Sequence, residues 1–479
     1  MIFDGIPFDA YLPEKSSVQS RSLISFIDLL ENRFGGRFLI DARGVPFERP
    51  DLLEPLRLAA LLKEHDIIQS FGESFRYPDE PQIKIWYAVC NNAASHRTGG
   101  SSFSSDSDAL FAALAEALER YLWYTQEDYF RNPRIATLDG IRKYEPAIAP
   151  KQFVGFSEMQ RKGNPDREMR SDTEYQWIKV ASLISGKDVY IPSQIVSGIR
   201  KRNGMAREPL IRRATTNGLA TWPTKAGAIM RGVLELFERE AYMITWMNQL
   251  TLPRIALDTL SKQHPSLAYS LEQCRRYRLK VHAVEMLTDA PTHCVMAVVE
   301  DESGLAPRFT VGLKSHRALH TAIEKALSEA LRARLGQRKW AEGGNVWDTK
   351  TPADLVGHYE RLYYWSVPEH ARHLEFLIAG KESEPETKPW DSDTEEEHLK
   401  RALEWCAQKK FELLDIPLGD SAKNPTPWHV EMVVIPELQP TYLTEDSRLF
   451  GGTRWQDVPK AFGYTPRNEP YTEMPHPFA

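Results

Sequence analysis

Two segments of the chain repeat one arrangement of charged residues. The segments AALAEALERY and RGVLELFERE share the spacing E-x-x-E-R, and each residue of the second copy lies at the same offset from its counterpart. The six residues are Glu116, Glu119, Arg120, Glu235, Glu238 and Arg239. Carboxylates bind hard divalent cations such as Mg²⁺, and arginine grips phosphate oxygens in bidentate fashion. The residue types and their spacing therefore favour a site for a magnesium nucleotide.

An α-helix would bring the charged residues of each copy to one face, because positions i, i+3 and i+4 are neighbours there. Apolar residues at helical spacing flank both copies and predict helices at about residues 107–126 and 224–247. A third amphipathic helix is predicted over 318–335, with Glu329 and Arg332 in its second half. Three helices would thus present carboxylates and arginines.

A second interpretation is that these charges form ordinary ion pairs on solvated helix faces, since Glu and Arg are good helix formers. Loops rich in Gly, Ser, Thr or Asn precede the first two helices, and such loops expose backbone N–H groups to anions. Carboxylates held together would also repel one another unless cations lie between them. The repetition and the loops favour the nucleotide site. The chain has no G-x-x-x-x-G-K-[ST] segment, so a P-loop enzyme is not indicated.

The composition is that of a folded chain without a strong charge bias. Hydrophobic residues make up 42% of its 479 residues, and the net charge is −6 from 60 basic and 66 acidic side chains. This balance argues against a general nucleic-acid or membrane binder. We find no secretory signal and no membrane-spanning apolar run, so we expect a cytoplasmic protein. The four cysteines form no C-x-x-C pair, which argues against a zinc knuckle or a disulfide framework.

The order of the predicted elements indicates a mixed α/β fold, with sheets packed on the three helices. We expect an N-terminal accessory or docking region at 1–80 and a catalytic domain at 81–479. An acidic insertion is expected near 381–398 and a proline-rich tail at 465–479.

Strands are predicted where apolar and β-branched residues run together between turn signals. The segments are IKIWYAVCNNA, the hairpin YQWIKVASLISGKDVYIPSQIV, the pair LKVHAVEML and THCVMAVVED, and WHVEMVVIPEL. A basic loop, SGIRKRNGMAREPLIRR, would either line the path of a nucleotide or peptide or lie in solvent. Its basic residues are Arg200, Lys201, Arg202, Arg207, Arg212 and Arg213.

The chain resembles YcaO-domain proteins in four segments that occur in the order of that family. They are ALAEALERY, WIKVASLISGKDVYIPSQIV, TTNGLATWPTKAGAIMRGVLELFERE and ALHTAIEKALSEALRARL. The resemblance runs from about residue 83 to the C-terminus, and the block TNGLA…LELFERE is its most specific part. It implies a YcaO-like fold that binds ATP between the three helices.

The resemblance also implies roles for individual residues. Glutamates would hold Mg²⁺ against the ATP phosphates, and a second group would contact the nucleotide. The metal ligands implied are Glu116, Glu119, Glu235, Glu238 and Glu329. The nucleotide contacts implied are Arg120, Thr216, Asn217, Arg239, Lys325 and Glu329.

The C-terminal part resembles the azoline-forming cyclodehydratases of the family, in VVIPELQPTYLTEDSRLFGGTR and in the ending MPHPFA. These enzymes use ATP to convert Cys, Ser or Thr of a ribosomally made precursor peptide to thiazoline or oxazoline, in the biosynthesis of peptide natural products such as bacteriocins. Their proline-rich tail is thought to lie near the active site. The resemblance therefore makes Pro475 and Pro477, together with Arg239, candidates for catalysis.

Some positions depart from the family pattern. Ala112 stands where the family often has Ser, Lys325 and Arg332 where it has Arg and Gln, and Glu473 at the first proline position of the tail. Two alternatives therefore stay open, another amide activation such as thioamide or amidine formation, and a non-catalytic ATP-binding scaffold subunit. We expect an E1-like, leader-binding partner protein, because no leader-binding module is recognisable, and we allow for a flavin dehydrogenase and a homo-oligomer.

Overall fold

A computed structural model gives the fold of the chain. It describes residues 50–478 except 92–96, 126–132, 198–207, 344–349, 353–354 and 356–357. It also describes four short strands, β1 (Ile2–Phe3), β2 (Ile6–Pro7), β3 (Phe38–Ile40) and β4 (Pro46–Glu48). Two segments lie outside the described residues. One is SLISFIDLLENRFGG, whose apolar pattern and closing glycines predict a helix, and the other is most of the basic loop.

The chain divides into two compact units. Unit 1 consists of Met1–Asp128, Ala220–Thr224 and Leu418–Val430. Unit 2 consists of Tyr129–Leu219, Lys225–Pro417 and Glu431–Ala479. The chain passes from one unit to the other within strand β11 (Leu219–Trp222) and again within β18 (His429–Val434). The accessory role of residues 1–80 stays a prediction.

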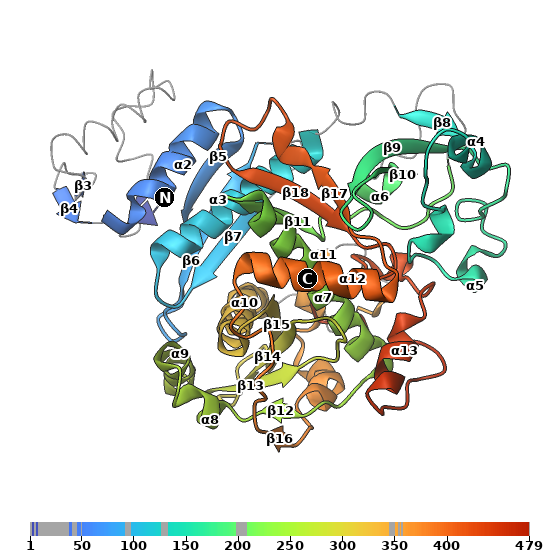
Figure 1. The fold of residues 1–479 in the computed structure, drawn as a ribbon. Helices are drawn as coiled ribbons and strands as arrows, with labels where there is room; N and C mark the ends of the chain where they lie inside the picture. The colour runs from blue at the N-terminus through green and yellow to red at the C-terminus, as the bar shows by residue number, and fades with distance from the viewer. Residues whose placement is uncertain are drawn as a thin grey trace. The chain divides into compact units, whose positions relative to one another are not determined.

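Unit 1 is built on a three-stranded antiparallel sheet of order β5-β6-β7, with α2 and α3 packed beside it (Figure 1). The helix predicted at about 107–126 is confirmed as α3. Its alanines and leucines form the buried stripe, and Ser105 Oγ accepts a hydrogen bond from Asp108 N–H in its first turn. The elements are η2 (Pro50–Leu52), α2 (Leu53–Glu64), β5 (Ile68–Glu73), β6 (Lys84–Cys90), β7 (Arg97–Ser102), α3 (Asp106–Thr125) and η8 (Leu418–Asp420).

Two glycines let a strand lie directly on a signature helix. A Cβ atom at Gly100 of β7 would stand 2.0 Å from the carbonyl oxygen of Ala109 in α3. In unit 2, a Cβ at Gly312 would stand 2.2 Å from the carbonyl oxygen of Ala326. Since real Cβ atoms do not approach so closely, glycine is required at both strand–helix contacts.

Unit 2 contains a mixed sheet of order β15-β14-β13-β12-β16, in which β13, β14 and β15 are antiparallel neighbours. All but one of the β14 residues are buried, because α7 and α10 both contact β14 and β15. The pairing of LKVHAVEML with THCVMAVVED is thereby confirmed. The elements are β12 (Arg254–Ile255), β13 (Leu279–Glu285), β14 (His293–Asp301), β15 (Phe309–His316), β16 (Glu382–Ser383), α7 (Lys225–Asn248) and α10 (Leu319–Glu342).

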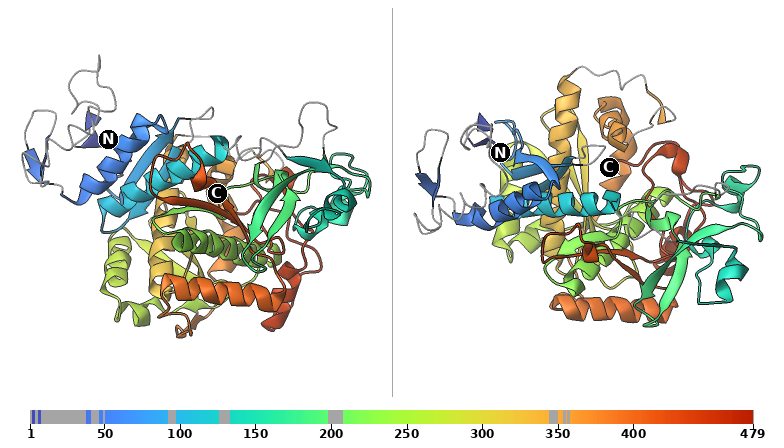
Figure 2. Two further views of the ribbon diagram at one scale, coloured as in Figure 1. Left: turned by 45° about the horizontal axis from the view of Figure 1, so that its top comes forward. Right: turned by 90° about the horizontal axis from the view of Figure 1, so that it is seen from above.

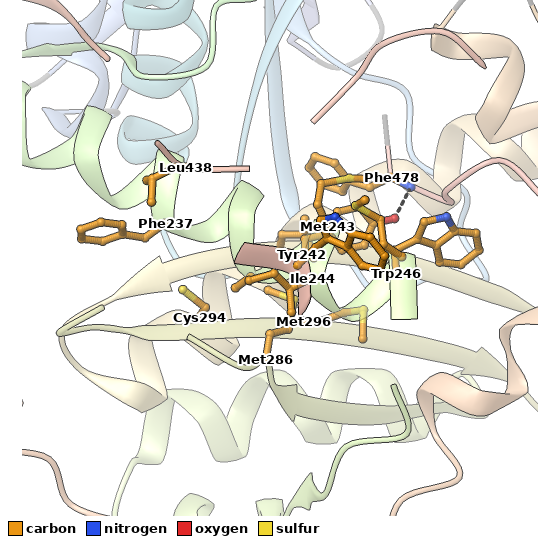
Figure 3. Packing of buried hydrophobic residues seen from close by; sticks show 14 of the residues in the cluster. Phe237, Tyr242, Met243, Ile244, Trp246, Met286, Cys294, Met296, Leu438 and Phe478 are labelled. Atoms are coloured by element: carbon orange, nitrogen blue, oxygen red, sulfur yellow. Dashed lines mark hydrogen bonds between the residues drawn. The ribbon is translucent and has the colours of Figure 1, made fainter. Parts of the chain in front are cut away.

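The core of unit 2 forms where α7 lies against this sheet. Phe237, Ile244 and Trp246 of α7 pack over Cys294 and Met296 of β14 (Figure 3). Because α7 is apolar around most of its circumference, it is also covered from another side by α12 (Glu395–Lys409), which lies alongside it (Figure 2). Two charged residues of α7, Glu238 and Glu240, are buried along with its apolar residues.

A second large sheet has the order β10-β9-β17-β18-β11, with β8 paired to β9. The predicted hairpin around Ser185–Gly186 is confirmed as β9 and β10. The acidic stretch near 381–398 includes β16, which pairs with β12, and the first turn of α12. The strands are β8 (Arg134–Ala136), β9 (Tyr175–Ser182), β10 (Asp188–Pro192) and β17 (Leu414–Pro417).

Short helices complete unit 2. They are α4 (Leu138–Arg142), η4 (Pro150–Gln152), α5 (Glu158–Arg161), α6 (Gln194–Ser197), α8 (Leu257–Ser261), α9 (Pro265–Arg276), α11 (His358–Tyr364), η7 (Pro368–Leu377), η9 (Glu445–Ser447) and α13 (Arg454–Ala461). All four cysteines are buried and free. In the part of the chain that the structure describes, no helix combines the length and the apolar character that crossing a membrane requires.

Candidate functional site

Each of the three signature helices carries a glutamate that is held by the backbone of a preceding strand or turn. The carboxylate accepts a hydrogen bond from an N–H group 17, 17 or 16 residues earlier in the chain. The bonds run from Gly99 to Glu116 (3.1 Å), from Gly218 to Glu235 (2.9 Å) and from Leu313 to Glu329 (2.8 Å). The repeat seen in the sequence is therefore a repeated strand–helix unit, and the third helix belongs to it.

In unit 1 the charged residues of α3 are fixed by such contacts. Glu116 pairs with Arg120 at 3.2 Å, one helical turn away. Glu119 accepts a hydrogen bond of 2.6 Å from the N–H group of Thr221 in β11. The backbone N–H donors fix the orientation of both carboxylates. The three residues form one charged face on α3, as predicted from their spacing.

In unit 2, Arg239 lies among carboxylates. It pairs with Glu235 at 3.2 Å and makes a short ion pair with Glu238. Glu238 is almost fully buried and accepts a 2.6 Å hydrogen bond from the N–H group of Ser315 in β15. Burial by itself would lower the pKa of Arg239, but Glu238, Glu235 and Glu329 raise it above its ordinary value. Arg239 is thus a fixed positive charge within an acidic group.

Glu329 of α10 completes this group, which we call the α7–α10 acidic cluster (Glu235, Glu238 and Glu329). Burial and the nearby Glu238 raise the pKa of Glu329 above the usual carboxyl value. Arg332 lies 3.7 Å from its carboxylate. Like charges held this close favour an additional cation.

The donor set of this cluster fits Mg²⁺, which prefers hard oxygen ligands. In the described residues no three His, Cys, Asp or Glu side chains are arranged to hold a metal by themselves. Mg²⁺ is usually held by one or two carboxylates together with substrate phosphates and water. The pair Glu238 and Glu329 therefore suits a magnesium ion that is shared with a nucleotide.

The remaining predicted nucleotide contacts lie in two places. Asn217 precedes β11, and its amide Nδ2 donates a 2.6 Å hydrogen bond to Thr441 Oγ1. The carbonyl oxygen of Thr216 accepts a hydrogen bond from the N–H group of Leu219, in the turn that leads into β11. Lys325 is exposed on α10 near His316, where burial and this lysine lower the pKa of the imidazole to about 3. The roles proposed for these residues stay predictions.

The C-terminal segment passes beside Arg239. Pro475 and Pro477 are buried, and the N–H group of Phe478 donates to the hydroxyl of Tyr242 on α7 at 3.2 Å (Figure 3). The Phe478 ring centre lies 4.5 Å from the guanidinium carbon of Arg239. The segment is thus packed on the same helix as the E-x-x-E-R residues.

Arg361 of α11 holds this segment in place, although no sequence pattern points to this residue. The guanidinium is buried, pairs with Glu445 at 3.1 Å and donates to the Leu443 carbonyl at 2.8 Å. Its Nη1 also lies 2.9 Å from His476 Nε2, which accepts this hydrogen bond. No motif marks Arg361, because its partners are mostly backbone carbonyls that only the folded chain brings together.

A pocket of about 500 Å³ of empty volume, part of it open to solvent, adjoins the acidic cluster. Its polar lining combines Arg239 and Asn217 with Arg212, Gln439 and Thr441. Apolar residues of β18 and of the following loop form much of the remaining wall. The lining, with its guanidinium groups, favours an anionic ligand.

The sequence model of the family described as "YcaO cyclodehydratase, ATP-ad Mg2+-binding" matches residues 102–439. The chain belongs to the YcaO family. The match includes all three signature helices, the strands β11 and β15, and the pocket lining up to Gln439. The family is thus one of ATP- and Mg²⁺-binding proteins, in agreement with the chemistry expected from the residues.

A curated relative, an uncharacterised protein of Methanothermobacter thermautotrophicus, is 25% identical over 166 residues. These residues are 34% of this YcaO chain and 42% of the relative, so the chain matches less than half of that protein's length.

Solved structures share the fold. A heterocyclase in complex with substrate and cofactor has a TM-score of 0.67 at 18% identity, over 98% of this chain and 60% of its own. YcaO from Methanopyrus kandleri, bound with AMPPCP and Mg²⁺, has a TM-score of 0.57 at 16% identity, over 84% of this chain and 94% of its own. The E. coli microcin synthetase McbBCD complex has a TM-score of 0.56 at 13% identity, over 77% of this chain and 88% of the matched one. The mixed α/β fold predicted from the sequence is confirmed.

Proposed function

We propose that this YcaO chain is an ATP-dependent cyclodehydratase that forms thiazoline or oxazoline rings in a ribosomally synthesised precursor peptide. The observation that carries the proposal is the α7–α10 acidic cluster around Arg239, beside a pocket and the buried C-terminal segment. The family match and the cyclodehydratase-like C-terminal sequence support the same activity.

In the proposed reaction, the side chain of Cys, Ser or Thr attacks the preceding backbone carbonyl carbon. The resulting oxyanion takes the γ-phosphoryl group of ATP, and ADP leaves. The amide oxygen then departs as phosphate when the carbon–nitrogen double bond forms, and the protons of the nucleophile and the amide pass to solvent. Phosphorylation is needed because an amide oxygen is otherwise a poor leaving group.

The residues of the chain would act mainly by position and charge. Arg239 is held between Glu235 and Glu238, so its guanidinium is fixed before phosphoryl oxygens arrive. Glu238 and Glu329 would hold Mg²⁺, which when bound neutralises charge on the transferred group. Glu116 and Glu119 of α3 are proposed as further metal ligands, and Arg120, Thr216, Asn217 and Lys325 as nucleotide contacts. Pro475 and Pro477 would shape the site near Arg239.

We also propose that the chain acts with a leader-binding, E1-like partner protein. A flavin dehydrogenase that acts on the product, and self-association of the chain, are part of the same proposal. The microcin synthetase that shares the fold is itself a complex. The proposed setting is the cytoplasm, in the biosynthesis of a peptide natural product such as a bacteriocin.

The test is to incubate the chain, with the products of neighbouring genes, with the precursor peptide, ATP and Mg²⁺. Mass spectrometry should show the loss of one water per ring, and phosphate should be released in proportion. Exchange of sulfur for oxygen would instead indicate thioamide formation. Phosphate release that never depends on precursor would support a scaffold subunit and contradict the proposal.

A further inference from the structure

The pocket beside Arg239 has one positive charge that no acidic residue balances. Arg239 is paired with Glu235 and Glu238, and Arg213 is paired with Asp446 at 2.7 Å. Arg212, by contrast, donates only to the backbone carbonyl of Val154, at 3.3 Å. Among the described residues no carboxylate pairs with Arg212.

Burial makes this unbalanced charge costly. Arg212 is largely withdrawn from solvent, with only part of the residue exposed. This burial lowers the pKa of its guanidinium to about 10. A cation removed from water without a counter-charge is destabilising, and proteins usually compensate for it with a paired carboxylate or a bound anion. Since the described chain supplies no carboxylate here, an anionic ligand in the pocket would provide the missing charge.

The neighbouring polar groups suit such a ligand. Thr441 Oγ1 accepts a hydrogen bond from Asn217, which leaves the hydroxyl hydrogen of Thr441 and the second amide hydrogen of Asn217 as donors. Both residues line the pocket with Arg212 and Arg239. Two guanidinium groups, an amide and a hydroxyl together form a donor set for phosphate oxygens.

The pocket wall is also held rigidly. The N–H group of Gln439 donates to Glu240 at 3.0 Å, and its side-chain amide donates to the carbonyl of Leu449 at 2.8 Å. Glu240 is buried and is gripped by Arg454 through two hydrogen bonds of 2.7 and 2.6 Å. A wall fixed in this way keeps the Thr441 hydroxyl in position before a ligand binds.

We propose that Arg212 is a second phosphoryl-binding arginine of the site, and that the pocket it shares with Arg239, Asn217 and Thr441 receives a phosphoryl group. The inference rests on the proposed ATP-dependent function and adds a residue and a subsite to it. The group has two sources, the γ-phosphoryl end of ATP and the free phosphate that the reaction releases. Both present the same oxygens to the guanidinium.

The experiment is calorimetric titration of the full chain with ATP, ADP and inorganic phosphate, each in the presence of Mg²⁺. The variants are Arg212→Gln and Arg212→Lys, with Arg276→Gln as the control, because Arg276 is an exposed arginine of α9 outside the pocket. Melting temperatures of all the variants establish that each is folded.

If the subsite takes the γ-phosphoryl group, Arg212→Gln weakens ATP binding by about tenfold or more and leaves ADP binding nearly unchanged. If it takes the released phosphate, phosphate binding is weakened by a similar factor while ATP binding is unchanged. Arg212→Lys should recover part of the affinity, because it keeps the charge but loses the bidentate geometry.

Unchanged binding of all three ligands to folded Arg212→Gln would overturn the inference. The companion variant Glu238→Gln separates that failure from failure of the proposed function. If Glu238→Gln loses ATP binding and Arg212→Gln does not, the proposed function stands and the proposed Arg212 subsite is contradicted. A wild-type chain, tested with its partner proteins, that binds neither ATP nor phosphate would overturn both.

Discussion

Glu437 stands next to the pocket wall formed by Leu438 and Gln439. Burial, together with the nearby Glu412, raises the pKa of the Glu437 carboxyl from 4.5 to about 7. Between these two values the folded chain holds more protons than the unfolded chain does. The free energy of unfolding therefore falls as the pH rises through this window, and the loss is complete above the folded pKa.

We predict that Glu437→Gln removes this fall, because glutamine has no proton to lose. The shift corresponds to about 3 kcal/mol at most, at about 1.4 kcal/mol for each pH unit. Urea unfolding of both proteins at about pH 5 and about pH 8 measures it. An equal pH dependence of the unfolding free energy in the two proteins would show that the pKa of the Glu437 carboxyl is not raised in the folded chain.

Single residues differed in how far the sequence could indicate them. The E-x-x-E-R residues were predicted because a helix fixes the spacing of its own faces. The sequence marks Arg212 only as one residue of a basic loop. Whether a carboxylate pairs with it depends on residues that are distant in sequence, so this could not be predicted. Arg361 and Tyr242 could not be predicted, because their partners belong to the C-terminal segment.

At the scale of elements, the contact between β15 and α10 depends on glycine at position 312. We predict that Gly312→Ala destabilises the fold by about 1–3 kcal/mol, because its Cβ would meet the backbone of Ala326 and Ala330. Gly336→Ala, in α10, is the matched control. A Cβ there meets nothing within 4 Å, so alanine should stabilise α10 by about 0.5–1 kcal/mol. Thermal unfolding distinguishes the two, and a stabilised Gly312→Ala would contradict the close packing.

The C-terminal segment is a second element whose position is predicted to depend on one residue. Arg361→Met should cost about 1–3 kcal/mol, because the Leu443 carbonyl loses this donor and the buried Glu445 carboxylate keeps only Arg448 of its two arginine partners. It should also speed hydrogen exchange at Phe478, whose N–H is bonded to Tyr242. Arg372→Met, an exposed residue of η7, should change stability by less than about 0.5 kcal/mol. Unchanged exchange at Phe478 in Arg361→Met would show that other contacts suffice.

Periodicity identified the elements that carry the site but not all of their partners. Helices α3 and α7 begin and end close to their predicted bounds, because their apolar stripes are regular. Helix α10 begins as predicted but continues past residue 335 to Glu342. The strand N–H groups that hold Glu116, Glu235 and Glu329 were not foreseen. Every residue except proline has a backbone N–H group, so the sequence does not indicate which of these groups will donate to a glutamate. Only the folded structure shows this regularity.

At the scale of the whole molecule, the mixed α/β class followed from the order of helical and strand patterns. The division into two discontinuous units did not, because the chain changes unit in the middle of β11 and β18. A strand that continues through a boundary carries no change of composition there. The short segments 220–224 and 418–430 therefore gave no hint that they join unit 1.

Our central proposal is that the E-x-x-E-R residues of α7, together with Glu329 of α10, bind Mg²⁺ and ATP. Its most direct test is calorimetry of ATP binding with and without Mg²⁺, on the wild-type chain, on Glu238→Gln and on the control Glu272→Gln, which alters an exposed glutamate of α9. We predict that binding requires Mg²⁺, is unchanged in the control, and is weakened by about tenfold or more in Glu238→Gln. ATP binding that is equally strong in Glu238→Gln, or that does not depend on Mg²⁺, would contradict the claim.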